Sequence, residues 1–286
     1  MKVKGNNILI VGGASGIGRL LGILSIEKGA SSVTIWDVND DNIDKVTAEF
    51  RFLAGGRTKI FGLHADVSNN GSVRRAYSDT LVRVGQVDMV INCAGIVTSN
   101  KAFADNTPEE IERTMRINAI GPMNVALTVI NDMIKRDKGH ICTIASAAGM
   151  LSNPKMSAYA ASKWAVIGWS DSVRIELQEM KSKVRVTTVA PYYINTGMFD
   201  GVQSKIFPIL DPGKTAKKIL SAVERNVDFK GIPFPFHFIR FWQGVLPTKV
   251  FDWFFGQVFG IYHTMDNFTG RKQQETCSLQ TQRRAG

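Results

Sequence analysis

The sequence predicts an α/β fold with a doubly wound parallel sheet, built as a single domain with an aromatic-rich C-terminal extension. Three observations predict this fold. Short apolar, β-branched runs alternate with helical patterns, each helical pattern is too long for a hairpin connection, and a glycine-rich turn follows the first apolar run. With 286 residues, of which 44% are hydrophobic and 21% charged, the chain can bury a sizeable core.

Six strands are predicted from the apolar runs, at Ile8–Val11, Ser32–Trp36, Lys59–Leu63, Val87–Asn92, His140–Ala145 and Val184–Ala190. Five helices are predicted between them, at Gly16–Lys28, Asn42–Leu53, Ser72–Val84, Pro108–Lys135 and Ser157–Lys181. Because strands and helices alternate, the strands must pair in parallel, and right-handed crossovers place helices on both faces of the sheet. The arrangement is Rossmann-like. After Pro191 the pattern weakens to a loop and one further helix at Pro212–Asn226.

Composition excludes several classes of protein. The net charge of +10 is spread over the chain without a long basic run, so we expect no nucleic-acid partner. Three cysteines cannot all pair and lack metal-binding spacing, which favours a reducing compartment and no metal site. The apolar N-terminal run is too short for a signal peptide or a membrane span. We therefore expect an intracellular, cytoplasmic protein.

The turn after the first strand has the sequence GGASGIG and contains Gly12, Gly16 and Gly18. Glycines at these positions allow a tight turn and a close approach of the backbone to a pyrophosphate, and the following helix offers its N-terminal N–H groups. Taken alone, a glycine-rich stretch is also explained by a flexible turn. Its place at the first strand–helix junction of a doubly wound sheet predicts a dinucleotide-binding site.

Asp37 ends the second strand about 20 residues after the glycines. A carboxylate there accepts hydrogen bonds from the adenosine ribose and repels a 2′-phosphate, which favours NAD over NADP. Two alternatives stay open. Asp37 could cap the next helix, and Arg19 could contact a 2′-phosphate and so favour NADP.

The motifs that carry a family resemblance are the glycine turn, Asn92-Cys93-Ala94-Gly95, and Tyr159-x-x-x-Lys163, which lies 13 residues after Ser146. The chain resembles the short-chain dehydrogenase/reductase family over about residues 8–196. The resemblance implies an NAD(P)-dependent enzyme that acts on CH–OH groups, with the catalytic residues Asn118, Ser146, Tyr159 and Lys163. Alone, Ser146 could be a turn hydroxyl and Asn118 a buried helix amide.

The chemistry of these residue types agrees with the resemblance. Hydride transfer from an alcohol requires a group that takes the hydroxyl proton, and for a tyrosine to do so its pKa must fall from about 10 to about 7, which takes roughly 4 kcal/mol. Lys163 stands one helical turn from Tyr159 and supplies a positive charge on the same face. We expect Ser146 to hydrogen-bond the substrate oxygen. The resemblance further implies that Lys163 binds the hydroxyl groups of the nicotinamide ribose. It also implies that Asn118 holds a water molecule of a proton relay to solvent.

The resemblance also implies the residues that contact the dinucleotide. They are Gly12, Ser15, Gly16, Ile17, Gly18, Asp37, Asp66, Val67, Asn92, Ala94, Gly95, Tyr159, Lys163, Pro191, Ile194 and Thr196. Two departures from the family pattern, Val11 and Cys93, remove side-chain hydrogen bonds that usually tie the glycine turn to a neighbouring strand. The run Pro191–Phe199, together with Gly16–Arg19 and Trp36-Asp37, resembles the membrane-associated retinol and 17β-hydroxysteroid dehydrogenase subgroup.

Half of the 26 aromatic residues fall between Phe229 and Phe268. Prolines interrupt this stretch, so no transmembrane helix of about 20 residues fits. It could form a lid over an apolar pocket, a segment that contacts a membrane or lipid-droplet surface, a dimer interface, or an ordinary core subdomain. We divide the chain into a dinucleotide-binding and catalytic domain (1–228), an aromatic-rich segment (229–272) and a tail expected to be flexible (273–286).

The sequence therefore predicts an oxidoreductase that transfers a hydride between NAD(H) and a secondary or allylic alcohol or carbonyl of a lipophilic substrate such as a steroid, a retinoid or a long-chain lipid. Tyr159 is the predicted general acid/base. We expect a homodimer or a higher homo-oligomer. One alternative is an NADP-linked carbonyl or 3-oxoacyl reductase. Another, from a different class, is a non-catalytic nucleotide-sensing or lipid-surface binding protein, which the intact set of catalytic residues disfavours.

Overall fold

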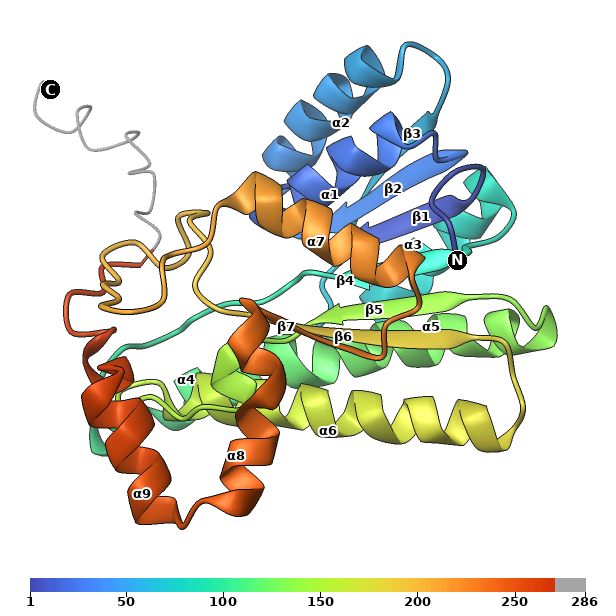
Figure 1. Cartoon of the computed structure of the whole chain (residues 1–286). Helices are drawn as coiled ribbons and strands as arrows, with labels where there is room; N and C mark the ends of the chain where they lie inside the picture. Colours follow the sequence, from blue (N-terminus) through green and yellow to red (C-terminus); the bar gives the residue numbers. More distant parts are fainter. Residues whose placement is uncertain (271–286) are drawn as a thin grey trace, which may run out of the picture.

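A computed structural model describes residues 1–270 and shows one central seven-stranded sheet in which all neighbouring strands are parallel (Figure 1). The strand order is β3-β2-β1-β4-β5-β6-β7. The strands span Asn7–Val11 (β1), Ser32–Asp37 (β2), Lys59–His64 (β3), Met89–Asn92 (β4), His140–Ile144 (β5), Arg185–Pro191 (β6) and Phe229–Ile232 (β7). The predicted doubly wound sheet is confirmed, since the order reverses between β1 and β4.

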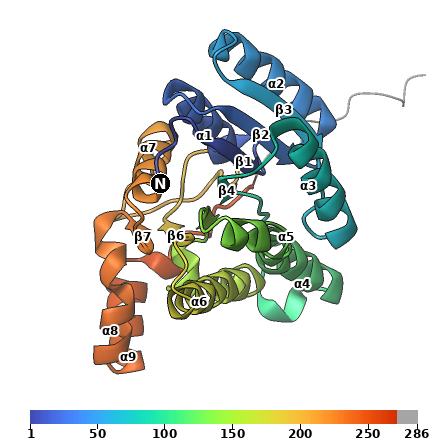
Figure 2. The ribbon, with the colours of Figure 1, turned by 90° about the vertical axis from the view of Figure 1, so that its right-hand side faces the viewer.

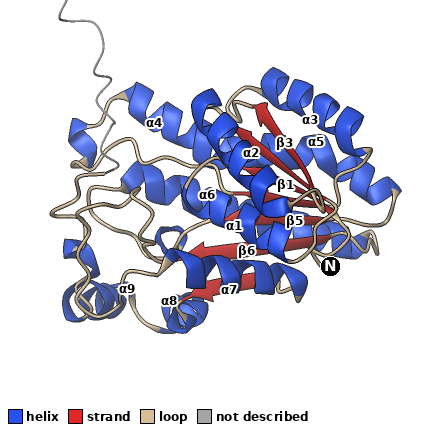
Figure 3. Ribbon diagram, turned by 90° about the horizontal axis from the view of Figure 1, so that it is seen from above, coloured by secondary structure: helices blue, strands red, loops and turns tan. Residues whose placement is uncertain are grey.

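Helices cover both faces of the sheet (Figures 2 and 3). On one face lie α1 (Gly16–Glu27), α2 (Asp40–Ala54) and α7 (Pro212–Glu224). On the other face lie α3 (Asn70–Val84), α5 (Gly121–Lys135) and α6 (Ser157–Glu179), with α4 (Pro108–Met115) packed beside α6. Because both faces are covered, β1, β2, β4 and β5 are almost completely buried.

Four of the helices begin at a side chain that caps their N-terminus. Asn39 caps α2 and Asn69 caps α3, each through its side-chain oxygen. Thr107 and Glu110 form a reciprocal capping box at α4, and Asp211 caps α7. Capping by Asp37, one alternative that the sequence left open for the run Asp37–Asp40, does not occur, because Asn39 of the same run is the cap.

Two features differ from the sequence-based prediction. The predicted helix Pro108–Lys135 is divided into α4 and α5 by a π-helical turn at Arg116–Ile120. The seventh strand, Phe229–Ile232, pairs in parallel with β6 and was not predicted. Its four residues include one β-branched side chain and stand directly before Pro233, so they carry little strand signal.

The aromatic-rich segment begins with β7 and continues through α8 (Ile239–Val245), α9 (Thr248–Asp252) and a second π-helical turn at Trp253–Val258. These short helices project from the sheet edge formed by β6 and β7 (Figure 1). Among the described residues, no helix is long and apolar enough to cross a membrane. The division of the chain at residue 228 stays a prediction, and the predicted tail at 273–286 lies outside the described residues.

Candidate active site

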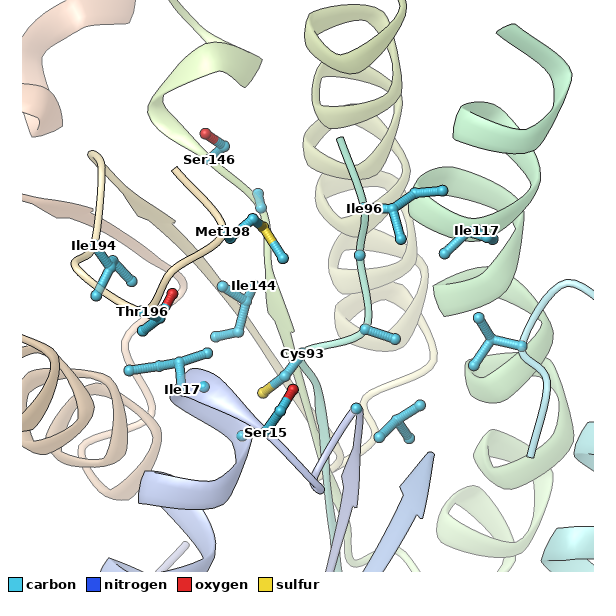
Figure 4. Close-up of a pocket in the computed structure, with 18 of the residues that line it drawn as sticks. Ser15, Ile17, Cys93, Ile96, Ile117, Ile144, Ser146, Ile194, Thr196 and Met198 are labelled. Carbon is cyan, nitrogen blue, oxygen red and sulfur yellow. The ribbon is translucent and has the colours of Figure 1, made fainter. Parts of the chain in front are cut away.

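A pocket of about 290 Å³ lies at the carboxyl ends of the strands, where the strand order reverses. Figure 4 shows Ser15 and Cys93 at its floor, Ile194 and Thr196 along one wall, and Ile96 and Ile117 along the opposite wall. Tyr159 and Lys163 of α6 line the same pocket, as does Ser146, which follows β5. The fold therefore joins the glycine turn and the predicted catalytic residues in one cavity.

The geometry of the glycine turn requires glycine at two positions. Gly12 has φ of +73°, and a Cβ there would lie 2.7 Å from the Ala94 backbone nitrogen. A Cβ on Gly18 would lie 2.1 Å from the Gly12 carbonyl oxygen. The turn is thus packed against the segment after β4, and the first residues of α1, whose N–H groups have no partner within the helix, line the pocket.

The turn is tied to its neighbours without the usual side-chain bonds of residues 11 and 93. The Gly12 N–H donates to the Trp36 carbonyl at 2.7 Å, and the Cys93 N–H donates to the Val11 carbonyl at 2.8 Å. In addition, the Ala14 N–H donates to the Asp37 carboxylate at 3.1 Å. Asp37 therefore anchors the turn as well as lining the pocket.

Arg19 turns away from the pocket. Its guanidinium forms a forked ion pair with Glu49 of α2, in which Nε donates to Oε2 at 2.7 Å and Nη2 contacts Oε1. A bidentate carboxylate partner satisfies the planar guanidinium geometry. The ion pair with Glu49 therefore engages Arg19, the residue that could have contacted the 2′-phosphate of NADP.

Tyr159 and Lys163 are almost completely buried. Burial raises the pKa of Tyr159 to about 12, and the adjacent Ser146 hydroxyl opposes this rise. Burial lowers the pKa of Lys163 to about 8, although its Nζ donates to the Ile144 carbonyl at 3.2 Å. The Lys163 Nζ lies 5.6 Å from the centre of the Tyr159 ring. A largely protonated ammonium group thus faces a neutral phenol at pH 7.

Asn118 lies in the π-helical turn between α4 and α5 and is fully buried. Its Oδ1 accepts from the Ile96 N–H at 2.8 Å, and its Nδ2 donates to the Ile96 carbonyl at 2.9 Å. A Cβ on Gly95 would stand 3.4 Å from Asn118 Oδ1 and 3.5 Å from Lys163 Nζ. Glycine at position 95 therefore keeps open the space between the amide and the ammonium group. A π-helical turn at such a place is typical of functional sites.

The end of the pocket beside Tyr159 is apolar and aromatic. Phe199 packs edge-on against Tyr159, with ring centres 6.0 Å apart, and against Tyr193 at 5.0 Å. Met198 and Ile96 add apolar side chains to the pocket from opposite sides (Figure 4). A second cavity of about 20 Å³ continues behind Phe199. This end favours an apolar substrate over a charged one.

Most predicted site residues line the pocket, and two do not. Asn118 lies behind the pocket wall. Asn92 is buried, and neither atom of its amide has a hydrogen-bond partner among the described residues. Sequence reasoning missed several lining residues: Val38, Ala65, Ile96, Arg113, Ile117, Ile144, Ala145 and Tyr192. Ala65 and Ala145 directly follow β3 and β5, so the rule that sites form at strand carboxyl ends could have found them.

The residues present fit a dinucleotide. The left-handed glycines, the free helix N-terminus and the carboxylate at the end of β2 are the parts such a ligand requires, and they lie on one continuous cavity. Within residues 1–270, no group of histidine, cysteine or carboxylate side chains could hold a metal ion. Fold and site together define an oxidoreductase of the NAD(P)-dependent type that acts on CH–OH groups.

Comparisons with known proteins agree. The family model for short chain dehydrogenases matches residues 6–206. Epidermal retinol dehydrogenase 2 of Mus musculus is 32% identical over 276 residues, covering 95% of this chain and 88% of that protein. Human estradiol 17-beta-dehydrogenase 11 is 28% identical over 248 residues, covering 86% and 81%. The chain belongs to the short-chain dehydrogenase/reductase family and falls among its retinol and 17β-hydroxysteroid dehydrogenase relatives.

Solved structures share the fold. A short chain dehydrogenase/reductase from Burkholderia phymatum in complex with NAD superposes with a TM-score of 0.77 at 20% identity, covering 85% of this chain and 95% of that one. A 3-oxoacyl-[acyl-carrier protein] reductase from Brucella melitensis gives a TM-score of 0.72 at 26% identity, covering 81% and 91%.

Proposed function

We propose that the protein transfers a hydride between NAD(H) and a secondary or allylic alcohol, or the matching carbonyl, of a lipophilic substrate. One observation supports this most strongly: Ser146, Tyr159 and Lys163 converge at the apolar end of the cavity that begins at the glycine turn. An alcohol carbon placed between them reaches both a proton-transferring group and the bound dinucleotide. Bound NAD(H) supplies the hydride-accepting or hydride-donating ring.

Tyr159 is the proposed general acid/base. With a pKa of about 12, the phenol is protonated at pH 7 and ready to donate a proton to a carbonyl oxygen. Alcohol oxidation needs the phenolate, which at pH 7 lies about 7 kcal/mol above the phenol for a pKa of about 12. The Lys163 ammonium and the Ser146 hydroxyl both favour the phenolate. Ser146 also holds the substrate oxygen, and Asn118 shapes the route for protons to solvent.

We assign the remaining predicted residues to dinucleotide binding. Asp37, Asp66 and Val67 surround the end expected for the adenosine, and the glycine turn with Ser15 and Ile17 faces the pyrophosphate. Ala94 and Gly95 form the opposite wall, and Asn92 is buried next to them outside the pocket lining. Pro191, Ile194 and Thr196 lie toward the nicotinamide end. Thr196 approaches Gly16 across the cavity, since a Cβ on Gly16 would lie 3.6 Å from the Thr196 Cβ.

NAD is the proposed cofactor. The Asp37 carboxylate lines the pocket, and its charge repels a 2′-phosphate. The guanidinium of Arg19, which could bind a 2′-phosphate, instead pairs with Glu49. A lipophilic substrate is supported by the walls formed by Ile96, Met198 and Phe199, and by the retinol and estradiol in the names of the relatives. A homodimer or higher homo-oligomer remains part of this proposal.

The test is a turnover assay at the absorbance of the reduced nicotinamide. Purified full-length protein is offered retinol, a 17β-hydroxysteroid, a long-chain secondary alcohol and a 3-oxoacyl thioester, each with NAD(H) and with NADP(H). We expect the highest kcat/KM for a lipid alcohol with NAD. Faster reduction of the thioester with NADPH would instead support the carbonyl-reductase alternative.

A further inference from the structure

The short helices of the aromatic segment have two different faces. We call residues 233–259 the aromatic hairpin. Its inner side chains, Phe236, Ile239, Phe251 and Phe255, are at most 8% exposed and belong to the same buried cluster as Tyr159. The inner face therefore packs into the hydrophobic core on the side of the protein that holds Tyr159.

The outer face is strongly apolar and open. Its exposed side chains, each between 38% and 64% accessible, are Phe234, Phe238, Phe241, Trp242, Val245, Val250, Trp253, Phe254 and Val258. Nine such side chains within 25 residues far exceed the isolated apolar residues normal for a soluble surface. No described residue covers them, so they are available for a partner.

The charges of the hairpin favour one kind of partner. Its basic side chains are Arg240 and Lys249, and its only carboxylate is Asp252. Asp252 lies beside the Tyr262 hydroxyl in the groove between the hairpin and the body of the protein. Arg240 pairs with Asp171 at 2.9 Å, whereas Lys249 is exposed. A face rich in aromatic rings, edged by a lysine and without outward carboxylates, complements a phospholipid surface.

We propose that the outer face of the aromatic hairpin docks the enzyme onto a phospholipid surface. Tryptophan and phenylalanine rings suit the boundary between headgroups and acyl chains, and the short helices are suited to lie along that boundary rather than cross it. Because the inner face of the same hairpin belongs to the buried cluster that contains Tyr159, docking would hold the catalytic side of the protein near the lipid that contains a lipophilic substrate.

The experiment measures co-sedimentation of the full-length protein with phosphatidylcholine vesicles, with and without phosphatidylserine. The test variant is Phe241→Ser/Trp253→Ser, because these two rings are 60% and 61% exposed. Phe255 is left unchanged, since it is buried and its loss would disturb the core. The control variant is Phe52→Ser/Val82→Ser, whose side chains are 86% and 85% exposed on α2 and α3.

We expect wild type and the control to bind both vesicle types, more strongly with phosphatidylserine, and the test variant to lose at least about tenfold in partition coefficient. Failure of wild type to sediment, or equal binding by the test variant, would overturn the proposal. Light scattering after size exclusion tests the alternative that a second copy of the chain covers the outer face. If wild type does not bind vesicles but forms a dimer, and only the test variant loses that dimer, the face is a dimer interface. Docking is a property beyond the proposed catalytic function. Turnover of a short water-soluble alcohol needs no lipid, so it tests the catalytic function independently of docking.

Discussion

Asp37 serves two purposes at the end of β2. One carboxylate oxygen accepts from the Ala14 N–H at 3.1 Å and the other from the Val38 N–H at 2.9 Å, so the side chain holds the glycine turn while presenting negative charge to the pocket. If Asp37 sets the cofactor preference as proposed, this preference and the position of the turn depend on one residue. A substitution that keeps an acceptor but removes the charge separates these two roles.

For Asp37→Asn we predict that the ratio of kcat/KM for NAD over that for NADP falls at least about tenfold, because a charged hydrogen-bond acceptor is worth roughly 1.5–3 kcal/mol and the repulsion of a 2′-phosphate disappears. Steady-state kinetics with both cofactors measure it. Glu49→Gln is the companion variant, since it frees Arg19. An unchanged ratio in Asp37→Asn, with a shift in Glu49→Gln alone, would make Arg19 the specificity residue.

The burial of Lys163 lowers the stability of the folded protein. Its pKa falls from 10.5 to about 8 on folding, so the folded state is penalised fully below pH 8, and the penalty fades as the pH rises toward 10.5. We predict that Lys163→Met is inactive yet more stable at pH 7, by at most about 3 kcal/mol, with part of this gain offset by the lost bond to Ile144. Urea unfolding at pH 7 and at pH 10.5 measures it. A gain of equal size at both pH values would contradict the assignment to charge burial.

At the scale of elements, the junction of β1 and α1 depends on backbone approach. Gly18→Ala places a methyl group 2.1 Å from the Gly12 carbonyl oxygen, and we expect it to weaken dinucleotide binding and to cost about 1–3 kcal/mol of stability. Gly168→Ala is the matched control on α6, where a Cβ meets nothing within 4 Å. It should stabilise by about 0.5–1 kcal/mol. Fluorescence titration and thermal unfolding check both, and a Gly18→Ala protein that binds dinucleotide normally would refute the close-packed turn.

Strand β5 begins with a buried histidine. His140 is fully buried, its Nε2 lies 2.8 Å from the Thr187 hydroxyl, and burial lowers its pKa from 6.5 to about 3. The unfolded chain takes up a proton near pH 6.5 and the folded chain does not, so stability falls as the pH drops below 6.5. Between pH 7 and pH 5 this costs about 2 kcal/mol. Urea unfolding of His140→Gln should show a correspondingly shallower pH dependence, and an unchanged slope would contradict this origin.

The elements differ in how far the sequence foretells them. The six predicted strands agree with the structure within two residues at each end, because most of them are buried on both faces and give a nearly continuous apolar signal, whereas the edge strand β3 is only partly buried. The π-helical turn at Arg116–Ile120 leaves the helical pattern unchanged, so no local signal marks it. The site residues came from motifs, whereas the pairing of Arg19 with Glu49 depends on how α1 meets α2, which is set by tertiary packing.

At the scale of the whole molecule, the sheet brings together segments that are far apart in sequence. The glycine turn after β1 and the hydroxyl after β5 line one cavity, and the inner face of the aromatic hairpin after β7 packs in the same buried cluster as Tyr159. For the aromatic segment, the sequence left four interpretations open, because the division between buried Phe255 and exposed Trp253 arises only when the hairpin packs on the body.

The central claim is that Tyr159 moves the proton while a hydride passes from the alcohol carbon to NAD. The most direct measurement follows deuterium from the carbinol carbon of a lipid alcohol into the dinucleotide by mass spectrometry, for wild type and Tyr159→Phe. We predict one deuterium in the NADH formed by wild type, and a transfer rate 10²–10⁴-fold lower in Tyr159→Phe at nearly unchanged NAD affinity, since only the proton acceptor is lost. Deuterium absent from NADH, or more than about a tenth of the wild-type rate in Tyr159→Phe, would contradict the claim.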